Sequence, residues 1–202
     1  MTRHDPADVR AFFTERAADW DSRFPDDGPA YAAAVTGLGL RAGDRVLDAG
    51  CGTGRALPAL RAAVGPDGVV LGADLTPAML EEAVRAGRHR GAALARTDVT
   101  RLPVAEGALD AVFAAGLVSH LADVREGLAE LARATRPGGL LALFHPIGRA
   151  ALAARQGRQI TADDVRAEPR LRAVLAASGW RMTSYVDEDA RYLVRAERVR
   201  GG

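Results

Sequence analysis

The stretch that decides the fold reads VLDAGCGTG and runs from Val46 to Gly54. A short apolar strand ending at Asp48 leads into a turn with three alternating glycines, Gly50, Gly52 and Gly54. Because glycine has no Cβ, its backbone can come closer to a ligand than that of any other residue. The helix that follows points free N–H groups and the positive end of its dipole at the same place. We therefore predict that this turn holds a nucleoside-type cofactor, the alternative being a plain strand-to-helix turn.

The spacing of the glycines discriminates between cofactors. A dinucleotide-binding turn has the pattern Gly-x-Gly-x-x-Gly, whereas here every second residue is glycine and Asp48 precedes them. A phosphate-binding Walker loop would need Gly-Lys-Ser or Gly-Lys-Thr, and the chain contains no lysine. An NAD-dependent oxidoreductase is therefore only a minor alternative.

Outward from the turn, apolar strands and helices alternate along the chain. Strands are expected at residues 45–48, 69–73, 92–95, 109–114 and 140–144, with helices between them. Residues 137–139, Pro-Gly-Gly, are expected to stop the helix before the fifth strand, and the tail should hold a helix from 168 and a hairpin at 181–197. This order implies an α/β fold with a parallel sheet covered on both faces, which binds ligands beyond the carboxyl ends of its strands.

Length and composition suit one ordinary globular domain. The chain has 202 residues, of which 48% are hydrophobic and 26% charged, and a formal net charge of +1 that gives nucleic-acid binding no support. The only cysteine is Cys51, which excludes an internal disulfide. We see no long apolar span and no cluster with metal-ligand spacing, so we expect a cytoplasmic protein without a metal.

Four further segments follow the glycine turn, in order along the chain and at plausible spacing. They are residues 72–80, 96–99, 110–115 and 136–144, which read GADLTPAML, RTDV, DAVFAA and RPGGLLALF. Together with the turn they resemble the motifs of the class I S-adenosylmethionine-dependent methyltransferases, and especially the small-molecule enzymes similar to those of ubiquinone and menaquinone biosynthesis. The resemblance covers roughly residues 36–146.

That resemblance implies a Rossmann-like, doubly wound sheet of seven strands in the order 3-2-1-4-5-7-6, with strand 7 antiparallel. It also implies one domain over residues 1–202, in which helices at 1–38 form an N-terminal lid and 39–202 form the cofactor-binding core. The tail hairpin expected from the sequence agrees with this topology.

The cofactor implied by the resemblance is S-adenosyl-L-methionine. Asp74 would accept the ribose hydroxyls, because a carboxylate can take both protons. Asp98 would accept from the adenine amino group, the N–H of Val99 would meet a ring nitrogen, and carbonyls of the segment ending at Ala115 would bind the methionine amino group. The expected cofactor residues are Asp48, Gly50, Gly52, Gly54, Asp74, Leu75, Asp98, Val99 and Ala115.

Two histidines are candidate catalytic residues. His120 follows the fourth strand and His145 ends the fifth, so both should lie where the methyl acceptor sits, and an imidazole can accept a proton near neutral pH. The alternative is that each bonds a backbone group and shapes a loop. The aromatic residues Trp20, Phe24 and Tyr31 are expected to line an apolar acceptor pocket or lid.

Four other residues near the N-terminus are expected to have no direct part in binding or catalysis. Phe12 and Phe13 are expected to pack on the sheet, and Asp19 and Asp21 to be charges that face solvent.

The chain is therefore expected to be a methyltransferase (EC 2.1.1.-) that acts on a small organic acceptor, of the kind found in secondary metabolism. It would work as a monomer or homodimer, with no nucleic-acid or membrane partner. Two alternatives keep the cofactor: a binding protein or partner subunit, and a methyltransferase-like enzyme with non-methylating chemistry.

Overall fold

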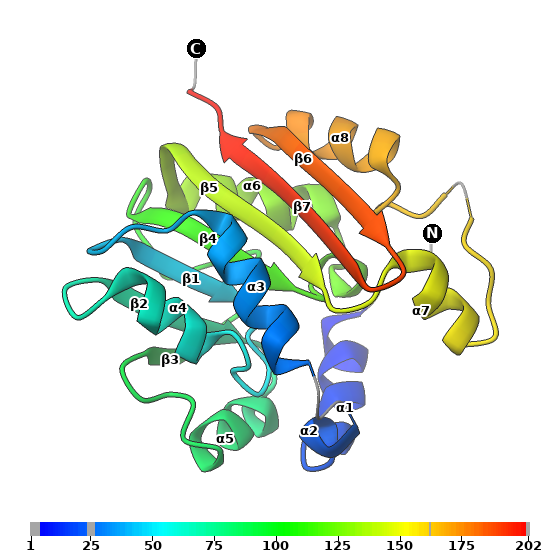
Figure 1. Ribbon diagram of the computed structural model, residues 1–202, viewed down its shortest axis with the longest axis horizontal. Helices are drawn as coiled ribbons and strands as arrows, with labels where there is room; N and C mark the ends of the chain where they lie inside the picture. The colour runs from blue at the N-terminus through cyan, green and yellow to red at the C-terminus, as the bar shows by residue number, and fades with distance from the viewer. Residues whose placement is uncertain (1–4, 24–26, 162, 201–202) are drawn as a thin grey trace.

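The computed structural model describes residues 5–23, 27–161 and 163–200, so Phe24 lies outside the described residues. A seven-stranded sheet forms the centre of the molecule, in the order β3-β2-β1-β4-β5-β7-β6 (Figure 1). β7 is antiparallel to β5 and β6, and the other neighbouring strands are parallel. The predicted strand order and the antiparallel seventh strand are confirmed. The strands are β1 Arg45–Ala49, β2 Val69–Asp74, β3 Ala93–Arg96, β4 Leu109–Ala115, β5 Thr135–His145, β6 Trp180–Glu188 and β7 Arg191–Arg198.

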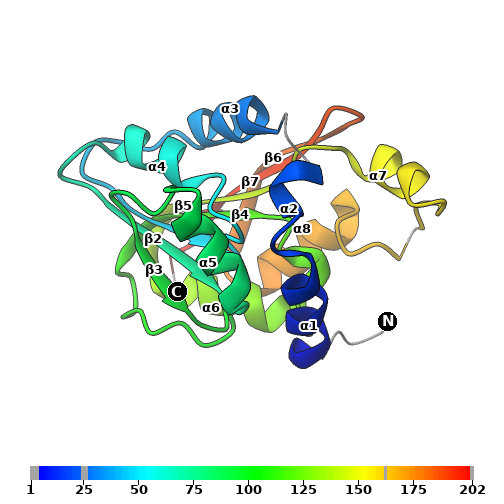
Figure 2. The ribbon, with the colours of Figure 1, turned by 90° about the horizontal axis from the view of Figure 1, so that it is seen from below.

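Helices cover both faces of the sheet, as Figure 2 shows with the sheet nearly edge-on. α3 and α4 lie on one face, and α6 and α8 lie on the other. Because alternate residues of a strand face opposite sides, Val46 of β1 is buried in the core under α3 and α4, and Leu47 in the core under α6 and α8. The helices are α1 Pro6–Arg16, α2 Trp20–Arg23, α3 Gly28–Leu38, α4 Leu57–Val64, α5 Pro77–Arg85, α6 Val124–Ala134, α7 Arg149–Arg155 and α8 Glu168–Ala177, with a short 3-10 helix at Val118–His120.

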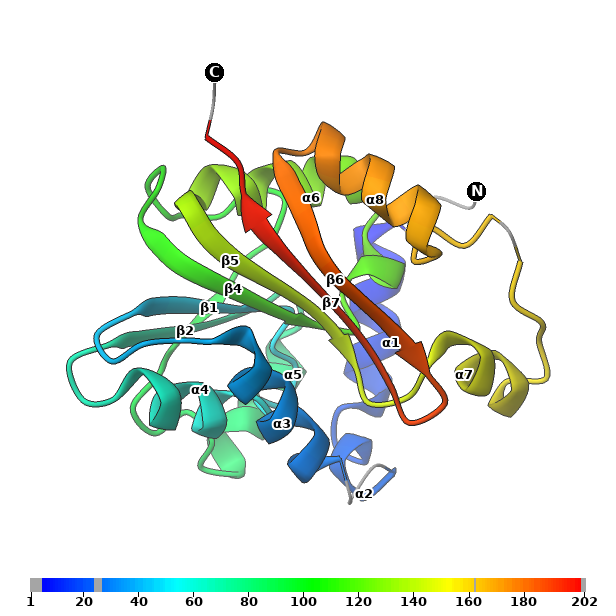
Figure 3. The ribbon, with the colours of Figure 1, turned by 45° about the horizontal axis from the view of Figure 1, so that its top comes forward.

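The first two helices lie at the carboxyl edge of the sheet and not on a face (Figure 3). The side chain of Asp5 caps α1 by accepting the N–H of Ala7 at 2.8 Å, and Pro6 occupies its first turn. α1 buries none of its own residues and packs against α5. α1 therefore depends on side-chain contacts with the rest of the molecule to hold its position.

The helix before the fifth strand ends earlier than its sequence suggests. α6 ends at Ala134, and β5 already begins at Thr135. The pairing of β5 with β4 then shifts register, while Arg136 donates to the carboxylate of Asp110 at 2.7 Å and keeps the chain extended. The expectation that Pro-Gly-Gly at 137–139 stops the helix is wrong, since these residues form an irregular stretch inside β5.

Candidate active site

The three glycines of the turn after β1 all have positive φ, but they differ in what surrounds them. At Gly50 a Cβ would meet Leu117 at 3.1 Å, and at Gly54 it would meet Leu57 at 2.9 Å. A Cβ at Gly52 would have no neighbour within 4 Å. Two of the glycines are therefore required by packing inside the protein, and the middle one leaves open space in front of the backbone.

Two carboxyl groups lie next to this turn, Asp48 fully buried and Asp74 partly buried. Asp74, at the end of β2, accepts the N–H of Gly52 at 2.8 Å with one oxygen and the N–H of Thr76 at 2.7 Å with the other. Asp48 is 1% exposed, and its Oδ2 has no hydrogen-bond partner among the described residues. A buried polar atom without a partner is costly, so Asp48 marks a place where a ligand group could bind.

The two acids titrate differently because their partners differ. Burial, together with the nearby charge of Asp74, raises the pKa of Asp48 to about 8. Burial also raises the pKa of Asp74, but the backbone N–H groups of Thr76 and Gly52 act against it. The larger rise in pKa therefore falls on Asp48, which lacks such donors, and the two N–H bonds to Asp74 stabilise the turn.

The remaining predicted cofactor residues lie at the same carboxyl edge. Asp98 follows β3, and its Oδ1 accepts the N–H and the hydroxyl of Thr100, both at 2.9 Å. Val99 is 6% exposed, with its side chain in the core. Leu75 and Ala115 are partly buried at the ends of β2 and β4. The fold thus brings the turn and all of these positions to one edge.

Asp21 in α2 is only partly exposed and is bonded to the glycine turn, so the expectation that it is merely a charge facing solvent is wrong. Its Oδ1 accepts the hydroxyl of Thr53 at 2.8 Å and Nε of Arg55 at 3.1 Å, and its Oδ2 accepts from Arg88. Burial raises the pKa of Asp21, but the bonds from Thr53 and Arg88 outweigh this and hold it below its usual value. Asp21 therefore ties the N-terminal helices to the glycine turn, because Thr53 is part of that turn. Asp19 is exposed, as expected.

The N-terminal aromatic residues form two separate contacts. Phe13 packs edge-on against Trp20 at 5.4 Å and against His120 at 5.0 Å between ring centroids. This contact joins α1 to the end of β4, so Phe13 does not pack on a sheet face as expected. Tyr31 of α3 packs edge-on against Phe144 of β5 at 5.1 Å. Trp20 and Tyr31 are thus both near the carboxyl edge but in different contacts.

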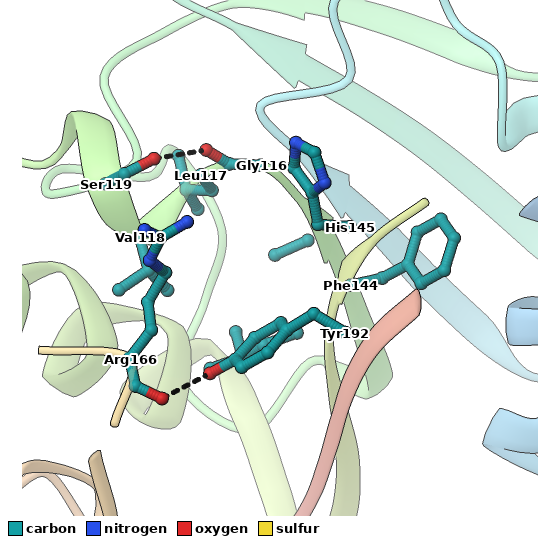
Figure 4. A pocket seen from close by; sticks show the side chains of 10 residues that line it. Gly116, Leu117, Val118, Ser119, Phe144, His145, Arg166 and Tyr192 are labelled. Carbon is teal, nitrogen blue, oxygen red and sulfur yellow. Dashed lines mark hydrogen bonds between the residues drawn. The ribbon is translucent and has the colours of Figure 1, made fainter. Parts of the chain in front are cut away.

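His145, the last residue of β5, lines a small hollow together with residues that the sequence did not single out (Figure 4). Its Nδ1 lies 2.9 Å from the carbonyl oxygen of Ile147, and burial, with the charge of Arg166, lowers its pKa despite that bond. The imidazole is therefore neutral at pH 7. Arg166 and Tyr192 line the same hollow, and no sequence signal separates them from the other arginines and tyrosines.

The described part of the chain lacks two kinds of feature. Residues 5–23, 27–161 and 163–200 contain no group of three or more histidine, cysteine, aspartate or glutamate side chains that could hold a metal ion. No helix in these ranges has the length and hydrophobicity needed to cross a membrane.

The fold and the site together define a class of protein. It is an α/β domain with an open glycine turn after β1 and acidic residues at the ends of β2 and β3, an arrangement suited to a nucleoside-type cofactor. The comparisons with known proteins agree. A family model described as a methyltransferase domain matches residues 47–143. The chain is 35% identical over 178 residues to the trans-aconitate 2-methyltransferase of Methylobacterium nodulans, over 86% of this chain and 67% of the relative.

Two further matches point the same way. A demethylmenaquinone methyltransferase of Beutenbergia cavernae is 36% identical over 143 residues, which are 68% of this chain and 57% of the relative. A solved SAM-dependent methyltransferase from Aquifex aeolicus has the same fold, with a TM-score of 0.71 at 22% identity over 96% of this chain and 99% of that one.

The chain belongs to the class I S-adenosylmethionine-dependent methyltransferases. It spans between 32% and 67% of the length of three curated relatives that it matches.

Proposed function

We propose that this protein transfers a methyl group from S-adenosylmethionine to a small organic acceptor. The observation that carries the proposal is the open backbone at Gly52 beside the unpartnered carboxyl oxygen of Asp48. Family membership supports the proposal, and so do the relatives, whose names describe methyl transfer to small molecules.

The residues around the glycine turn fit this cofactor. A cationic or N–H donor group of the ligand would provide the partner that Asp48 Oδ2 lacks, since a carboxyl oxygen accepts such bonds. Asp74 already accepts two backbone N–H groups and, as a carboxylate, has further lone pairs for ribose hydroxyls. Asp98, Leu75 and Ala115 complete the edge on either side. When bound, the cofactor supplies a methyl group activated by a sulfonium leaving group.

On the acceptor side, His145 is proposed as the base. Nδ1 lies 2.9 Å from the Ile147 carbonyl oxygen and 3.2 Å from the Ile147 N–H, and the proposal takes the tautomer favoured by the shorter contact, in which Nδ1–H donates to the carbonyl. In that tautomer Nε2 carries a free lone pair, and the lowered pKa of His145 favours the neutral ring that can accept a proton. His120, which contacts Phe13, is proposed to help shape the acceptor side from the end of β4. Trp20 and Tyr31 would exclude water, so that the nucleophile and the methyl carbon meet in a fixed orientation.

A cytoplasmic location and a monomeric or homodimeric state stay predictions from the sequence. An acceptor of secondary metabolism also stays a prediction, because the relatives act on chemically different molecules: trans-aconitate in one and demethylmenaquinone in another, by their names.

The cofactor site can be tested with S-adenosylhomocysteine and calorimetry. We expect Asp74→Ala to weaken binding about 10- to 100-fold, the range given by losing hydrogen bonds to a charged acceptor. Asp67→Ala is the matched control, because Asp67 is exposed and precedes β2 at the opposite edge of the sheet. Equal affinity of the two folded variants would refute the assignment of Asp74.

Transfer itself can be tested with S-adenosylmethionine labelled on the methyl group and a panel of small acceptors. Label on an acceptor supports the proposal. Tight binding of S-adenosylhomocysteine without transfer to any acceptor would favour the alternatives, a binding protein or non-methylating chemistry. In the calorimetric titration, an NAD-binding protein would instead bind NAD and would not bind S-adenosylhomocysteine.

A further inference from the structure

The hollow beside His145 is built from four parts of the chain that are distant in sequence. Gly116 and Ser119 follow β4, His145 ends β5, Tyr192 lies in β7, and Arg166 precedes α8. Figure 4 shows the Arg166 side chain running from its carbonyl oxygen toward Ser119, with His145 across the hollow. A guanidinium, a neutral imidazole and apolar side chains therefore face one small space at the carboxyl edge.

The position of Arg166 is fixed at its backbone. Its carbonyl oxygen accepts the hydroxyl of Tyr185 at 3.0 Å and that of Tyr192 at 3.1 Å. Its own N–H donates to Asp164 at 2.9 Å. Three hydrogen bonds on one residue of an irregular segment hold its Cα in place, and a positioned arginine binds with less loss of entropy than a mobile one.

The guanidinium is oriented as well. The carboxylate of Asp164 accepts Nε at 3.1 Å and Nη2 at 3.0 Å, a two-point pair. No bond to Nη1 is found among the described residues, so one N–H edge is left for another acceptor. Asp164 also pairs with Arg149 at 3.4 Å, and Arg149 pairs with Asp187 at 2.9 Å. These ion pairs hold the Arg166 guanidinium in its orientation before any ligand binds.

The charge of this cluster limits what it can bind. Two arginines, Arg149 and Arg166, and two aspartates, Asp164 and Asp187, cancel to zero, so the cluster offers one oriented donor edge without a large positive field. A monoanion such as a carboxylate fits that edge, whereas a dianionic phosphate would need further cations. Asp27, whose negative charge raises the pKa of His145, is itself paired with Arg55 at 3.5 Å.

We propose that Arg166 binds a carboxylate group of the methyl acceptor, so that the protein selects small organic acids over their neutral analogues. This inference rests on the proposed function, because it names the acceptor of that same site. Ser119, whose hydroxyl donates to the Gly116 carbonyl at 3.2 Å, closes the hollow opposite Arg166. The carboxylate is the group by which the acceptor is recognised, and the methylated atom then lies on the side of His145.

The test uses the full chain saturated with S-adenosylhomocysteine, which first checks the proposed function. Binding is then measured for benzoate, cinnamate and fumarate, each against its amide, with phenyl phosphate as a further probe. We expect at least one acid to bind the wild type 10-fold or more tightly than its amide, and Arg166→Gln to remove that difference. Arg166→Lys should recover only part of it, because lysine keeps the charge but not the planar fork.

Arg172→Gln is the matched control, since Arg172 is an exposed arginine on α8 that pairs with Glu168. It should leave the acid preference unchanged, and all variants should bind S-adenosylhomocysteine within twofold of the wild type. If every acid binds no better than its amide, or if Arg166→Gln keeps the preference, the inference is wrong while the proposed function stands. Preference for phenyl phosphate over all carboxylates would also overturn it. Failure to bind S-adenosylhomocysteine would instead contradict the proposed function.

Discussion

The attachment of the N-terminal helices through Asp21 gives the sharpest prediction. α1 buries none of its own residues, so this segment is held mainly by the Phe13 contacts, the packing of α1 on α5 and the Asp21 carboxylate. Asp21→Ala removes the bonds that the carboxylate accepts from Thr53, Arg55 and Arg88, and leaves the bond from Arg55 Nη2 to the Asp21 carbonyl at 3.2 Å. The expected result is a segment that detaches far more often from a core that stays folded.

The size of the effect follows from exposure. Hydrogen bonds to a charged group contribute about 1.5–3 kcal/mol each when shielded, and exposed ion pairs only about 0.2–1 kcal/mol. The Asp21 side chain is 35% exposed, between those limits, and one carboxylate serves all three partners. We therefore take about 2 kcal/mol for the whole set, which corresponds to about a 30-fold rise in the open population.

Hydrogen exchange read by mass spectrometry is the suitable assay, because local opening controls the exchange of amides in a peripheral helix. Peptides covering residues 6–23 should exchange about 30-fold faster in Asp21→Ala, while peptides of β1 and β4 should be unchanged. Asp19→Ala is the control, since Asp19 is exposed and lies two residues away. Exchange in Asp21→Ala that matches the Asp19→Ala rate would refute the reasoning.

The same carboxylate predicts a pH dependence. The folded pKa of Asp21 lies below its unfolded value of about 3.9, so the carboxylate stabilises the attachment fully above about pH 4. That contribution is lost as the pH falls through the folded pKa. Protection of residues 6–23 in the wild type should therefore decrease below about pH 4, and Asp21→Ala should show no such step.

Three further predictions concern the site. The pKa of Asp48 is raised to about 8 in the folded protein, so between about pH 4 and 8 only the unfolded chain releases this proton. The free energy of unfolding should therefore fall with rising pH, by up to about 1.4 kcal/mol per pH unit. In urea titrations at pH 6 and 8, Asp48→Asn should lose this pH dependence, and a variant that keeps it would contradict the assignment. Gly54→Ala places a Cβ 2.9 Å from Leu57 at a positive φ and should lower the free energy of unfolding by about 1–3 kcal/mol. Gly52→Ala should lose less stability but weaken cofactor binding. A Gly52→Ala variant that is less stable than Gly54→Ala would contradict this reasoning. His145→Ala should lower turnover about 100-fold or more with little change in affinity for S-adenosylhomocysteine, and wild-type turnover would leave His145 a structural role.

The residues proposed for the cofactor could be predicted from the sequence because their signals are local. The glycine turn is read within nine residues, and Asp74 and Asp98 each follow a recognisable apolar strand. Once the strand order is known, strand ends must meet at one edge of the sheet, so spacing alone brings these groups together. The sheet order itself came from the family resemblance and not from hydrophobic pattern.

The features near the site that the sequence did not predict are contacts between distant residues. Asp21 meets Thr53 and Arg88, which are 32 and 67 residues away, and an aspartate next to a tryptophan gives no sign of either. Arg166 lies in a hydrophilic stretch between elements, and its role depends on two tyrosine hydroxyls of β6 and β7 that reach back to its carbonyl. Local propensity carries no information about such partners.

The antiparallel pairing of β7 with β5 brings residues of the C-terminal tail next to the end of β5. His145 pairs with Tyr192 across the β5–β7 ladder, and Arg166, the residue proposed to bind the acceptor carboxylate, lies between them in the sequence. The strand-end residues proposed for the methyl donor fall between 48 and 115. A single genetic crossover between residues 115 and 145 would therefore exchange His145 and Arg166 together. The strand-end residues proposed for the methyl donor would be inherited intact.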